Sequence, residues 1–414
     1  MILRLGWAFS RPTSSSALQS LPDQIEYLSL AQNLLHGNGL SFIDPRFSDR
    51  VYAFRAPGYP LFLAACGANA RAARAVQAMV DTSTILAVFL IARRIAPKAR
   101  GLPFIAAVIA ACNPLLVYFC GLLLSETIFV AMLTWGMLLV YTGFSDWRPG
   151  GRNRSASRAK AVPWLGLIGG IVLALSVLVR PSAAGLPVAL GIGAVVANRQ
   201  EGLAYQSFPR PRPIARRIIT VGATTTILVV VVLTPWALRN LGALHHLIWT
   251  DTNAGFTLYD GYNANATGAS DQSFVKEMPG LRQMDEISRS NYLEQRAMGF
   301  AVAHPRRVVE LIIAKAVRTW SPVPLSAQFG GSVYRTALLC YSAPFDLLVL
   351  WGLWKGSPSR STKTFLLLPA IYLTVVHALT VGSLRYRVPA EPALAVLAAC
   401  AIRGDNRTSC RDFA

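Results

Sequence analysis

Residues 20–60 read SLPDQIEYLSLAQNLLHGNGLSFIDPRFSDRVYAFRAPGYP and form the longest polar segment in the first half of an otherwise apolar chain. Asp23, Glu26 and Tyr27 have the i, i+3, i+4 spacing that places side chains on one face of a helix. The glycines within 36–39 are typical of the end of that helix. An acid and an aromatic ring on one face, next to apolar segments, indicate a site rather than packing.

The composition places this segment in a membrane protein. Only 14% of the 414 residues are charged and 53% are hydrophobic, whereas soluble domains carry roughly 25% charged residues. The net charge of +20 comes from basic residues in separate short loops, which argues against nucleic acid as a partner and favours membrane lipids. The six cysteines form no CxxC pair, so zinc and redox motifs are absent.

Nine apolar segments are interpreted as membrane spans, which need about 20 apolar residues with a range near 17–25. They are 75–92, 102–119, 124–143, 163–179, 183–198, 218–237, 334–354, 364–382 and 388–402. Residues 1–19 contain no span, and 57–68 is short enough to favour a juxtamembrane or re-entrant helix. The predicted fold class is therefore all-α: a polytopic transmembrane helical protein with juxtamembrane helices in its outer loops.

The distribution of Arg and Lys orients these spans. Every second loop is basic, which marks the cytoplasmic side of an inner or plasma membrane. The outward segments are then 20–74, 120–123, 180–182, 238–333 and 383–387. An outer N-terminal segment normally follows a first span, so we expect Met1 to lie downstream of the true start, with a chain that begins outside as the alternative.

This topology divides the chain into five parts. They are an outer N-terminal segment (1–74), a six-span region (75–237), a large outer loop (238–333), a three-span region (334–402) and a cytoplasmic tail (403–414).

Two helices are predicted within the large outer loop. Residues 285–303 begin with acids in the first turn. Residues 305–320 begin with proline and end with Trp320, and their amphipathic pattern suits a membrane interface. The expected apolar face of the second helix contains Val308, Leu311, Ile312, the Lys315 stem and Val317.

Charged and aromatic side chains from distant parts of the chain fall on the same outer side. They are Asp23, Arg55, Tyr59, Glu126, Arg180, Arg239, Arg385, Tyr386 and Arg387. Ionisable groups at membrane depth are energetically expensive and are functional candidates by default. Together they form the candidate site.

Each of these residues also has a simpler interpretation. Asp23 follows a proline and can be a helix N-cap, and Glu126 can be a favourable charge at a helix N-terminus. The arginines can extend to lipid headgroups, and Tyr59 and Tyr386 can belong to an interfacial aromatic belt. Asp81, inside a span, is expected to pair with a neighbouring helix.

The motifs, taken in order, resemble the GT-C superfamily of membrane glycosyltransferases, closest to the protein O-mannosyltransferase-like and lipid A aminoarabinose transferase-like families. The resemblance covers residues 23 to about 400. It rests on D-x-x-x-Y at 23–27, RAPGYP at 55–60, LSE at 124–126, RP at 180–181, PWALRN at 235–240 with a Gly/Asn-rich loop to Gly268, and RYRVPAEP at 385–392.

The resemblance implies transfer of a sugar from a polyprenyl-phosphate donor to an acceptor hydroxyl on a lipid, glycan or protein, with inversion. Asp23 would be the general base, and Glu126 would orient the acceptor or hold a metal. Arg55, Arg385 and Arg387 would receive the departing phosphate.

No cofactor is implied with certainty. A divalent metal stays open, although Gln24 stands where relatives often carry an acid. The alternatives are a transporter or flippase for a lipid-linked sugar and a non-catalytic assembly partner. The position of the charges at span ends argues against a transporter, which places them near the bilayer midplane.

Overall fold

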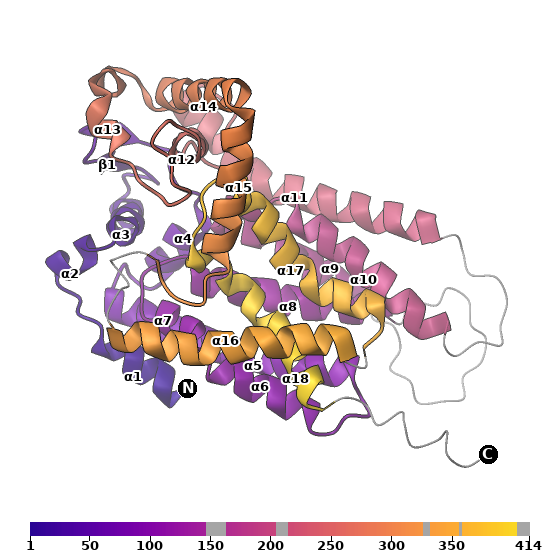
Figure 1. Cartoon of the computed structure of the whole chain (residues 1–414). Helices are drawn as coiled ribbons and strands as arrows, with labels where there is room; N and C mark the ends of the chain where they lie inside the picture. Colours follow the sequence, from indigo (N-terminus) through magenta and orange to yellow (C-terminus); the bar gives the residue numbers. More distant parts are fainter. Residues whose placement is uncertain (146–162, 204–213, 326–331, 356–357, 404–414) are drawn as a thin grey trace, which may run out of the picture.

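The computed structural model describes residues 1–145, 163–203, 214–325, 332–355 and 358–403 (Figure 1). Helices dominate this part of the chain, as the composition predicts. The strands described are β1 (Phe42–Asp44) and β2 (Asp49–Val51), which pair antiparallel with Phe42 opposite Val51. The chain is therefore an all-α membrane protein with one short hairpin.

The N-terminal part contains four helices. They are α1 (Ile2–Ser10), α2 (Ser15–Gln19), α3 (Pro22–Leu35) and α4 (Gly58–Ala65). The bundle is built from ten apolar helices: α5 (Ala70–Ile95), α6 (Leu102–Ala111), α7 (Pro114–Cys120), α8 (Glu126–Ser145), α9 (Pro163–Val179), α10 (Leu186–Leu203), α11 (Ile214–Leu244), α16 (Ser332–Lys355), α17 (Arg360–Ala378) and α18 (Glu391–Ile402). Between α11 and α16 lie α12 (Ala254–Gly261), α13 (Phe274–Glu277), α14 (Glu286–Ala303) and α15 (Pro305–Thr319).

Six of the described helical segments are long and apolar enough to cross a membrane, and a seventh results if the bent pair α6–α7 is one span. That pair covers the segment predicted as a single span at 102–119. The helices meet at 51°. α6 ends at Ala111, and Asn113 caps α7, where its side chain accepts hydrogen bonds from the N–H groups of Leu115 and Leu116.

The last predicted span, 388–402, is a short helical segment made of the 3₁₀ turn Val388–Ala390 and α18. α18 has 12 residues, so it is about 18 Å long against a hydrocarbon thickness of about 30 Å. Every residue from Glu391 to Cys400 is buried, and α18 packs between α6, α16 and α17. A helix that is apolar on all sides is typical of a protein core or of a membrane span, and α18 lies at the centre of this bundle.

An ion pair deep in the bundle holds α1 in place. Arg4 pairs with Asp81 of α5, and its guanidinium also donates to the carbonyls of Ala110 and Ala111. This confirms the prediction that Asp81 pairs with a neighbouring helix.

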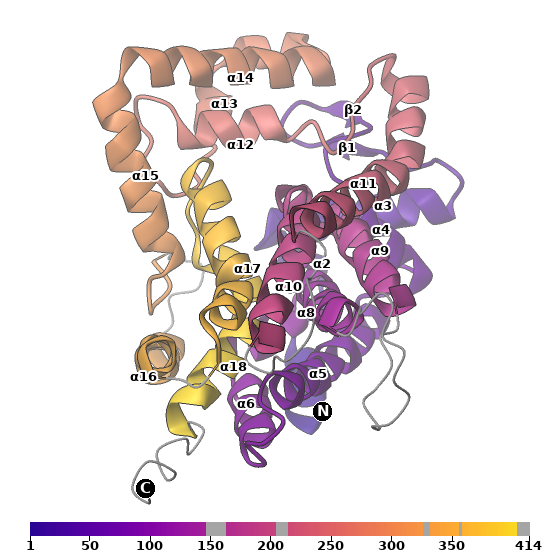
Figure 2. The ribbon, with the colours of Figure 1, turned by 90° about the vertical axis from the view of Figure 1, so that its right-hand side faces the viewer.

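A layer formed by β1, β2, α12, α13 and α14 lies beyond one end of the bundle, and α15 leads back from it (Figures 1 and 2). A buried cluster that includes Phe42, Phe54, Phe256, Leu293 and Leu311 holds this layer together. The aromatic residues of the first outer segment thus pack against the large outer loop, although some 200 residues separate them in the sequence.

The two helices predicted in the outer loop are confirmed as α14 and α15. Asp285 caps α14 by accepting from the N–H groups of Ile287 and Ser288, and proline begins α15. The expected apolar face of α15 needs correction: Leu311, Lys315 and Thr319 are buried, whereas Val317 is 64% exposed.

Candidate active site

Helix α3 presents the acid that the sequence singles out. Leu21 is the N-cap and Pro22 the first helical residue, so the carboxylate of Asp23 makes no capping hydrogen bond. The N-cap interpretation is therefore wrong, and the carboxylate is available for other contacts. Glycines with positive φ at Gly37 and Gly39 follow the helix, as its predicted end requires.

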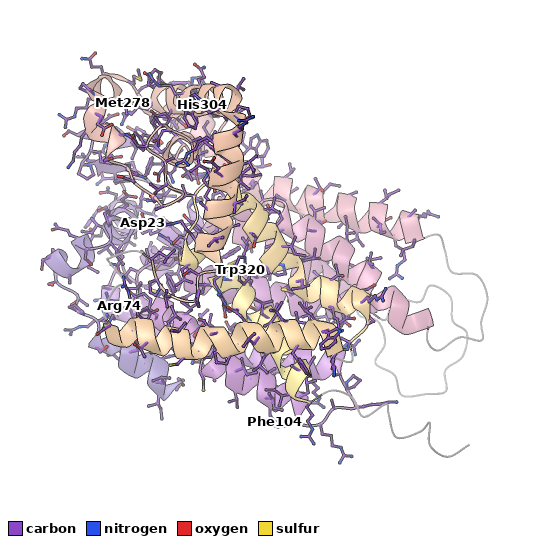
Figure 3. All side chains as sticks on the ribbon, in the orientation of Figure 1. Asp23, Arg74, Phe104, Met278, His304 and Trp320 are labelled. Carbon is purple, nitrogen blue, oxygen red and sulfur yellow. The ribbon has the colours of Figure 1, made fainter. Side chains whose placement is uncertain are left out.

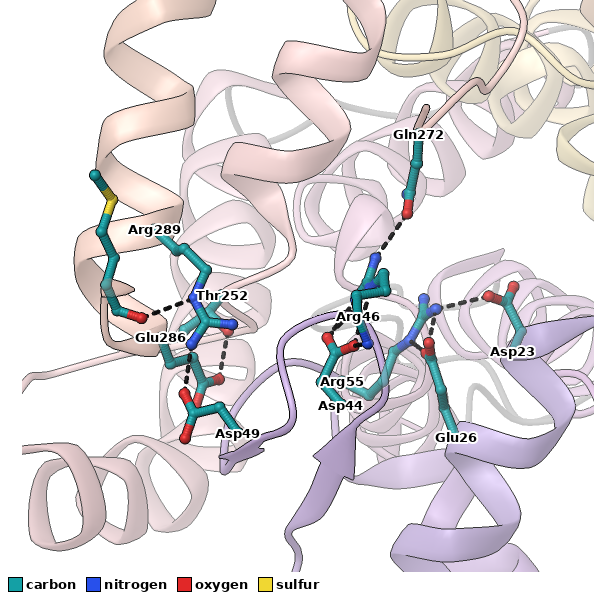
Figure 4. Close-up of polar contacts among 11 residues, drawn as sticks. Asp23, Glu26, Asp44, Arg46, Asp49, Arg55, Thr252, Gln272, Glu286 and Arg289 are labelled. Atoms are coloured by element: carbon teal, nitrogen blue, oxygen red, sulfur yellow. Dashed lines mark hydrogen bonds and ion pairs between the residues drawn. The ribbon is translucent and has the colours of Figure 1, made fainter. Parts of the chain in front are cut away.

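Arg55 joins two acids on this face of α3. Its Nη2 donates to Asp23 Oδ1 at 2.6 Å, and its Nε donates to Glu26 Oε2 at 2.7 Å (Figure 4). The guanidinium carbon also lies 5.5 Å from the centre of the Tyr27 ring. The predicted spacing of Asp23, Glu26 and Tyr27 thus places all three side chains around one arginine.

Arg385 connects α3 to the beginning of α8. It lies in the 3₁₀ turn Leu384–Tyr386, from which Nη1 donates to Asp23 Oδ2 at 3.0 Å and Nε donates to Glu126 Oε1 at 2.6 Å. Arg180, between α9 and the turn Pro181–Ala183, lies 3.2 Å from the same oxygen of Glu126. Six side chains from five parts of the chain therefore form one ionic network.

The network is open on one side. The side chain of Asp23 is 26% exposed, those of Arg55 and Arg385 are 17% and 25% exposed, and that of Glu126 is fully buried. Among the residues that the structure describes, Arg55 Nη1 and Arg385 Nη2 donate no hydrogen bond. Two guanidinium groups with spare donors thus flank the exposed carboxylate.

The two acids of α3 have opposite electrostatic environments. Burial opposes ionisation of Asp23, but Arg55 and Arg385 outweigh it and hold its pKa well below the usual range. For Glu26 burial dominates over the attraction of Arg55, and its pKa is raised. Asp23 is consequently the ionised partner of both arginines, and Glu26 is the more easily protonated acid.

The predicted aromatic residues lie behind or beside the network. The Tyr59 hydroxyl donates to Gln77 Oε1 at 2.5 Å, and its ring packs edge-on against Tyr27. Tyr386 stacks on His377 with 3.6 Å between ring centres, and the Arg180 guanidinium lies 5.4 Å from the Tyr386 ring.

Two predicted arginines lie outside the network. Arg387 is fully buried and bonds to Asp346 and Glu391, away from Asp23 and Glu126. Arg239 donates to the carbonyls of Tyr52 and Leu40, so it supports the segment that leads to Arg55.

Sequence reasoning missed Asp251, a partly exposed acid in the loop before α12. Its pKa is raised to about 6 because burial outweighs the nearby Arg55 charge and hydrogen bonds from backbone N–H groups. The only available signal was its place in the polar loop that follows PWALRN, because no spacing relates it to residues some 200 positions earlier.

These observations define a class of protein: a polytopic helical membrane protein with a partly open network of arginines and carboxylates between its bundle and its outer layer. Figure 3 shows Asp23 between the outer layer, marked by Met278 and His304, and the end of the bundle marked by Arg74.

Comparison with known proteins identifies the fold. No family model and no curated protein sequence matches the chain. Two solved structures of the oligosaccharyltransferase of Archaeoglobus fulgidus superpose on it. The archaeal enzyme AglB, in complex with an inhibitory peptide and a dolichol-phosphate, does so with a TM-score of 0.51 at 13% identity over 92% of this chain. The apo form gives 0.50 at 14% identity over 91%.

This chain spans about half the length of those structures, since it covers 46% of each. ArnT from Cupriavidus metallidurans bound to undecaprenyl phosphate is also similar, at 14% identity, but its TM-score of 0.37 is too low to support a conclusion. The superpositions show that this chain shares the fold of the matched part of the archaeal oligosaccharyltransferase structures.

Proposed function

We propose that this protein is a membrane glycosyltransferase that moves a sugar from a polyprenyl-phosphate donor to an acceptor hydroxyl. The observation that carries the proposal is the position of Asp23 between Arg55 and Arg385, with spare donors on both guanidinium groups. A carboxylate beside two phosphate-binding groups is what this transfer needs. The GT-C fold and the lipid phosphate named for the AglB complex agree with it.

The reaction begins when the acceptor oxygen attacks the anomeric carbon of the donor sugar. The bond from that carbon to the phosphate oxygen breaks, and its electron pair stays on the phosphate. The acceptor proton passes to Asp23, and attack opposite the leaving group inverts the anomeric centre. Arg55 and Arg385 stabilise the charge that develops on the phosphate.

The ionic network gives a reason why Asp23, a weak base before the donor binds, becomes able to accept the acceptor proton once the donor is bound. Without donor, two guanidinium groups hold the pKa of Asp23 far below neutrality, so its affinity for a proton is low. A phosphate bound to the same groups neutralises part of their charge and raises the pKa of Asp23. Donor binding therefore prepares the base, and Glu126 keeps Arg385 in place from its buried side.

A metal is not part of this mechanism. Within the residues that the structure describes, no three His, Cys, Asp or Glu side chains converge as a metal donor set. The acids of the network instead bond to arginines, so the residues present do not fit a divalent ion.

We place the reaction on the outer face of the cell membrane. The positive-inside pattern supports this side. Arg93 and Arg94 lie in the last turn of α5 and Lys355 ends α16, and α16 ends far from α3 (Figure 1). The basic stretches 148–160 and 403–414 lie largely outside the described residues.

The test is Asp23→Asn in membranes supplied with radiolabelled polyprenyl-phosphate hexoses and pentoses. We expect transfer to fall by about 10²–10⁴-fold, the usual contribution of a general base, while the amount of protein in the membrane is unchanged. Asp285→Asn is the matched control, because Asn replaces Asp well as a helix cap. Unchanged transfer by Asp23→Asn would remove this acid from the mechanism, and a wild type that uses no donor of the panel would refute the proposed function.

A further inference from the structure

The loop that carries Asp251 is bonded directly to the segment that carries Arg55. The N–H of Thr252 donates to the carbonyl of Ala53 at 2.9 Å. On the other side of Asp251, the carbonyl of Thr250 accepts from Trp236 Nε1 at 2.6 Å. Both neighbours of Asp251 are therefore fixed, one to the Arg55 segment and one to α11.

A buried acid of α14 clamps the two segments together. Glu286 is 5% exposed and accepts from the N–H groups of Tyr52 and Ala53, at 2.6 and 2.9 Å. It also accepts from the Thr252 hydroxyl at 2.5 Å (Figure 4). These bonds satisfy a carboxylate with three donors, so the clamp is a structural contact. It holds the residue after Asp251 against Tyr52 and Ala53, which precede Arg55 by three and two residues.

The carboxylate of Asp251 differs from that of Asp23 in what holds it. Asp23 bonds to two guanidinium groups, whereas Asp251 is influenced by the charge of Arg55 and by the backbone N–H groups of Asn253 and Ala254. It is partly exposed. It therefore keeps accepting capacity for a ligand, while the lone pairs of Asp23 are largely taken up by arginines.

The negative charge of the Asp251 side chain determines which kind of ligand it can bind. A carboxylate repels the donor phosphate and accepts hydrogen bonds from hydroxyl groups. We propose that Asp251 binds the acceptor: its carboxylate accepts a hydrogen bond from a hydroxyl group of the acceptor and positions that molecule beside Arg55 for attack on the sugar. This inference rests on the proposed function and names the acceptor side of the same site.

The ionisation of Asp251 supports this assignment. With a pKa of about 6, the acid is mostly ionised at neutral pH and protonated below pH 6, where its ability to accept the hydrogen bond weakens. The charged groups on the elements around this loop are Arg55, Asp23 and Glu26 on its network side, Arg239 on α11 and Glu286 on α14. Acceptor use should therefore decline as the pH falls through about 6.

A structural role for Asp251 at the start of α12 predicts a different outcome. Asn accepts backbone hydrogen bonds at a helix start about as well as Asp, so Asp251→Asn keeps the loop and removes only the negative charge. Asp251→Ala removes both. A purely structural residue would tolerate the first substitution and not the second.

The experiment uses the full chain in native membranes with the labelled donor panel and two measurements. One is transfer to the membrane acceptor, and the other is release of free sugar to water after the acceptor has been extracted. We expect Asp251→Asn to raise the apparent KM for re-added acceptor extract roughly 10- to 100-fold, the effect of losing one charged hydrogen bond. Release of sugar to water should stay close to the wild-type rate, because water needs no positioning carboxylate.

Two further results complete the test. The acid limb near pH 6 should be present in wild-type transfer and absent in Asp251→Asn, and Asp251→Glu should recover part of the affinity for acceptor. The control Asp285→Asn should leave both measurements unchanged. If Asp251→Asn lowers both measurements equally, or lowers neither, the inference is overturned although the enzyme is confirmed. If the wild type neither transfers nor releases sugar, the proposed function fails and this inference fails with it.

Discussion

Arg385 and Arg387 stand two residues apart in RYR and have opposite surroundings. Arg385 is 25% exposed and shared between Asp23 and Glu126, with Nη2 unbonded within the described part of the chain. Arg387 is fully buried. Its Nε donates to Glu391, and both of its terminal nitrogens donate to Asp346. Arg385 therefore keeps a donor nitrogen for a ligand, whereas all three guanidinium nitrogens of Arg387 are bonded to Glu391 or Asp346.

The difference shows what separates a binding charge from a structural one in this membrane protein. The pairing of Arg387 connects α16 and α18, and Asn113 of the α6–α7 break donates to the same Glu391 at 2.8 Å. The pairing of Arg385 connects elements too, but its partners face the open side of the network. Under the proposed function, a donor phosphate would bind Arg385 without displacing its carboxylate partners, whereas it would bind Arg387 only by disrupting buried ion pairs.

The largest expected effect tests the structural arginine. Arg387→Met should destabilise the protein by about 3–5 kcal/mol, because removal of one partner leaves the buried carboxylate of Glu391 uncompensated. The measurement is thermal unfolding and yield of the full chain in detergent. Arg385→Met is the matched control and should cost far less, since its partners keep Arg55 and Arg180. Equal losses in the two variants would contradict the distinction between the arginines.

The next largest effect tests the proposed phosphate-binding role of Arg385 by measuring sugar transfer. Arg385→Gln should lower sugar transfer by about 10²–10³-fold, as loss of one group that stabilises transition-state charge does, with normal yield. Arg385→Lys should recover only part of the rate, because an ammonium keeps the charge but lacks the fork that bonds Asp23 and Glu126 together. Full activity in Arg385→Gln would show that phosphate is received elsewhere.

The sequence predicts most of this fold because its signals are local. Composition alone indicates a helical membrane protein, and the helices α14 and α15 follow from an acidic first turn and a proline start. The nature of α18 was not predictable in this way. Its apolar run indicates a span at the edge or the centre of a bundle equally well, and only the structure shows that the helix has 12 residues and is buried among α6, α16 and α17.

The candidate site was predictable in part of its members but not in its pairings. The alternation of basic loops placed Asp23, Arg55, Glu126, Arg180 and Arg385 on one side of the membrane, and the structure brings these five together. Glu391, four residues after Arg387, was a local signal for the pairing of that arginine, whereas Asp346 and the partners of Arg385 lie in distant segments. Asp251 was missed for the same reason: its relation to Arg55 depends on a clamp by Glu286, which is a contact between distant segments.

Lys315 extends the comparison to a buried cation that has no acid bonded to it. It is fully buried on α15, and its Nζ makes no hydrogen bond within the described residues but lies 3.5 Å from the centre of the Tyr262 ring. Burial lowers its pKa to about 8, with only partial compensation from Asp260. The charged form therefore costs stability at neutral pH, unlike that of Arg387.

The smallest expected effect follows from this cost. Lys315→Met should raise the free energy of unfolding at pH 7 by about 2 kcal/mol, from a pKa shift of this size reduced by the lost cation–π contact. Between about pH 8 and 10.5 the unfolded chain binds more protons at this position than the native one, so wild-type stability should rise with pH. That slope should be absent in Lys315→Met, as measured by chemical unfolding of the full chain in detergent. A variant less stable than the wild type at pH 7 would show that the contact with Tyr262 outweighs desolvation, and Lys315 would then join Arg387 among the stabilising cations.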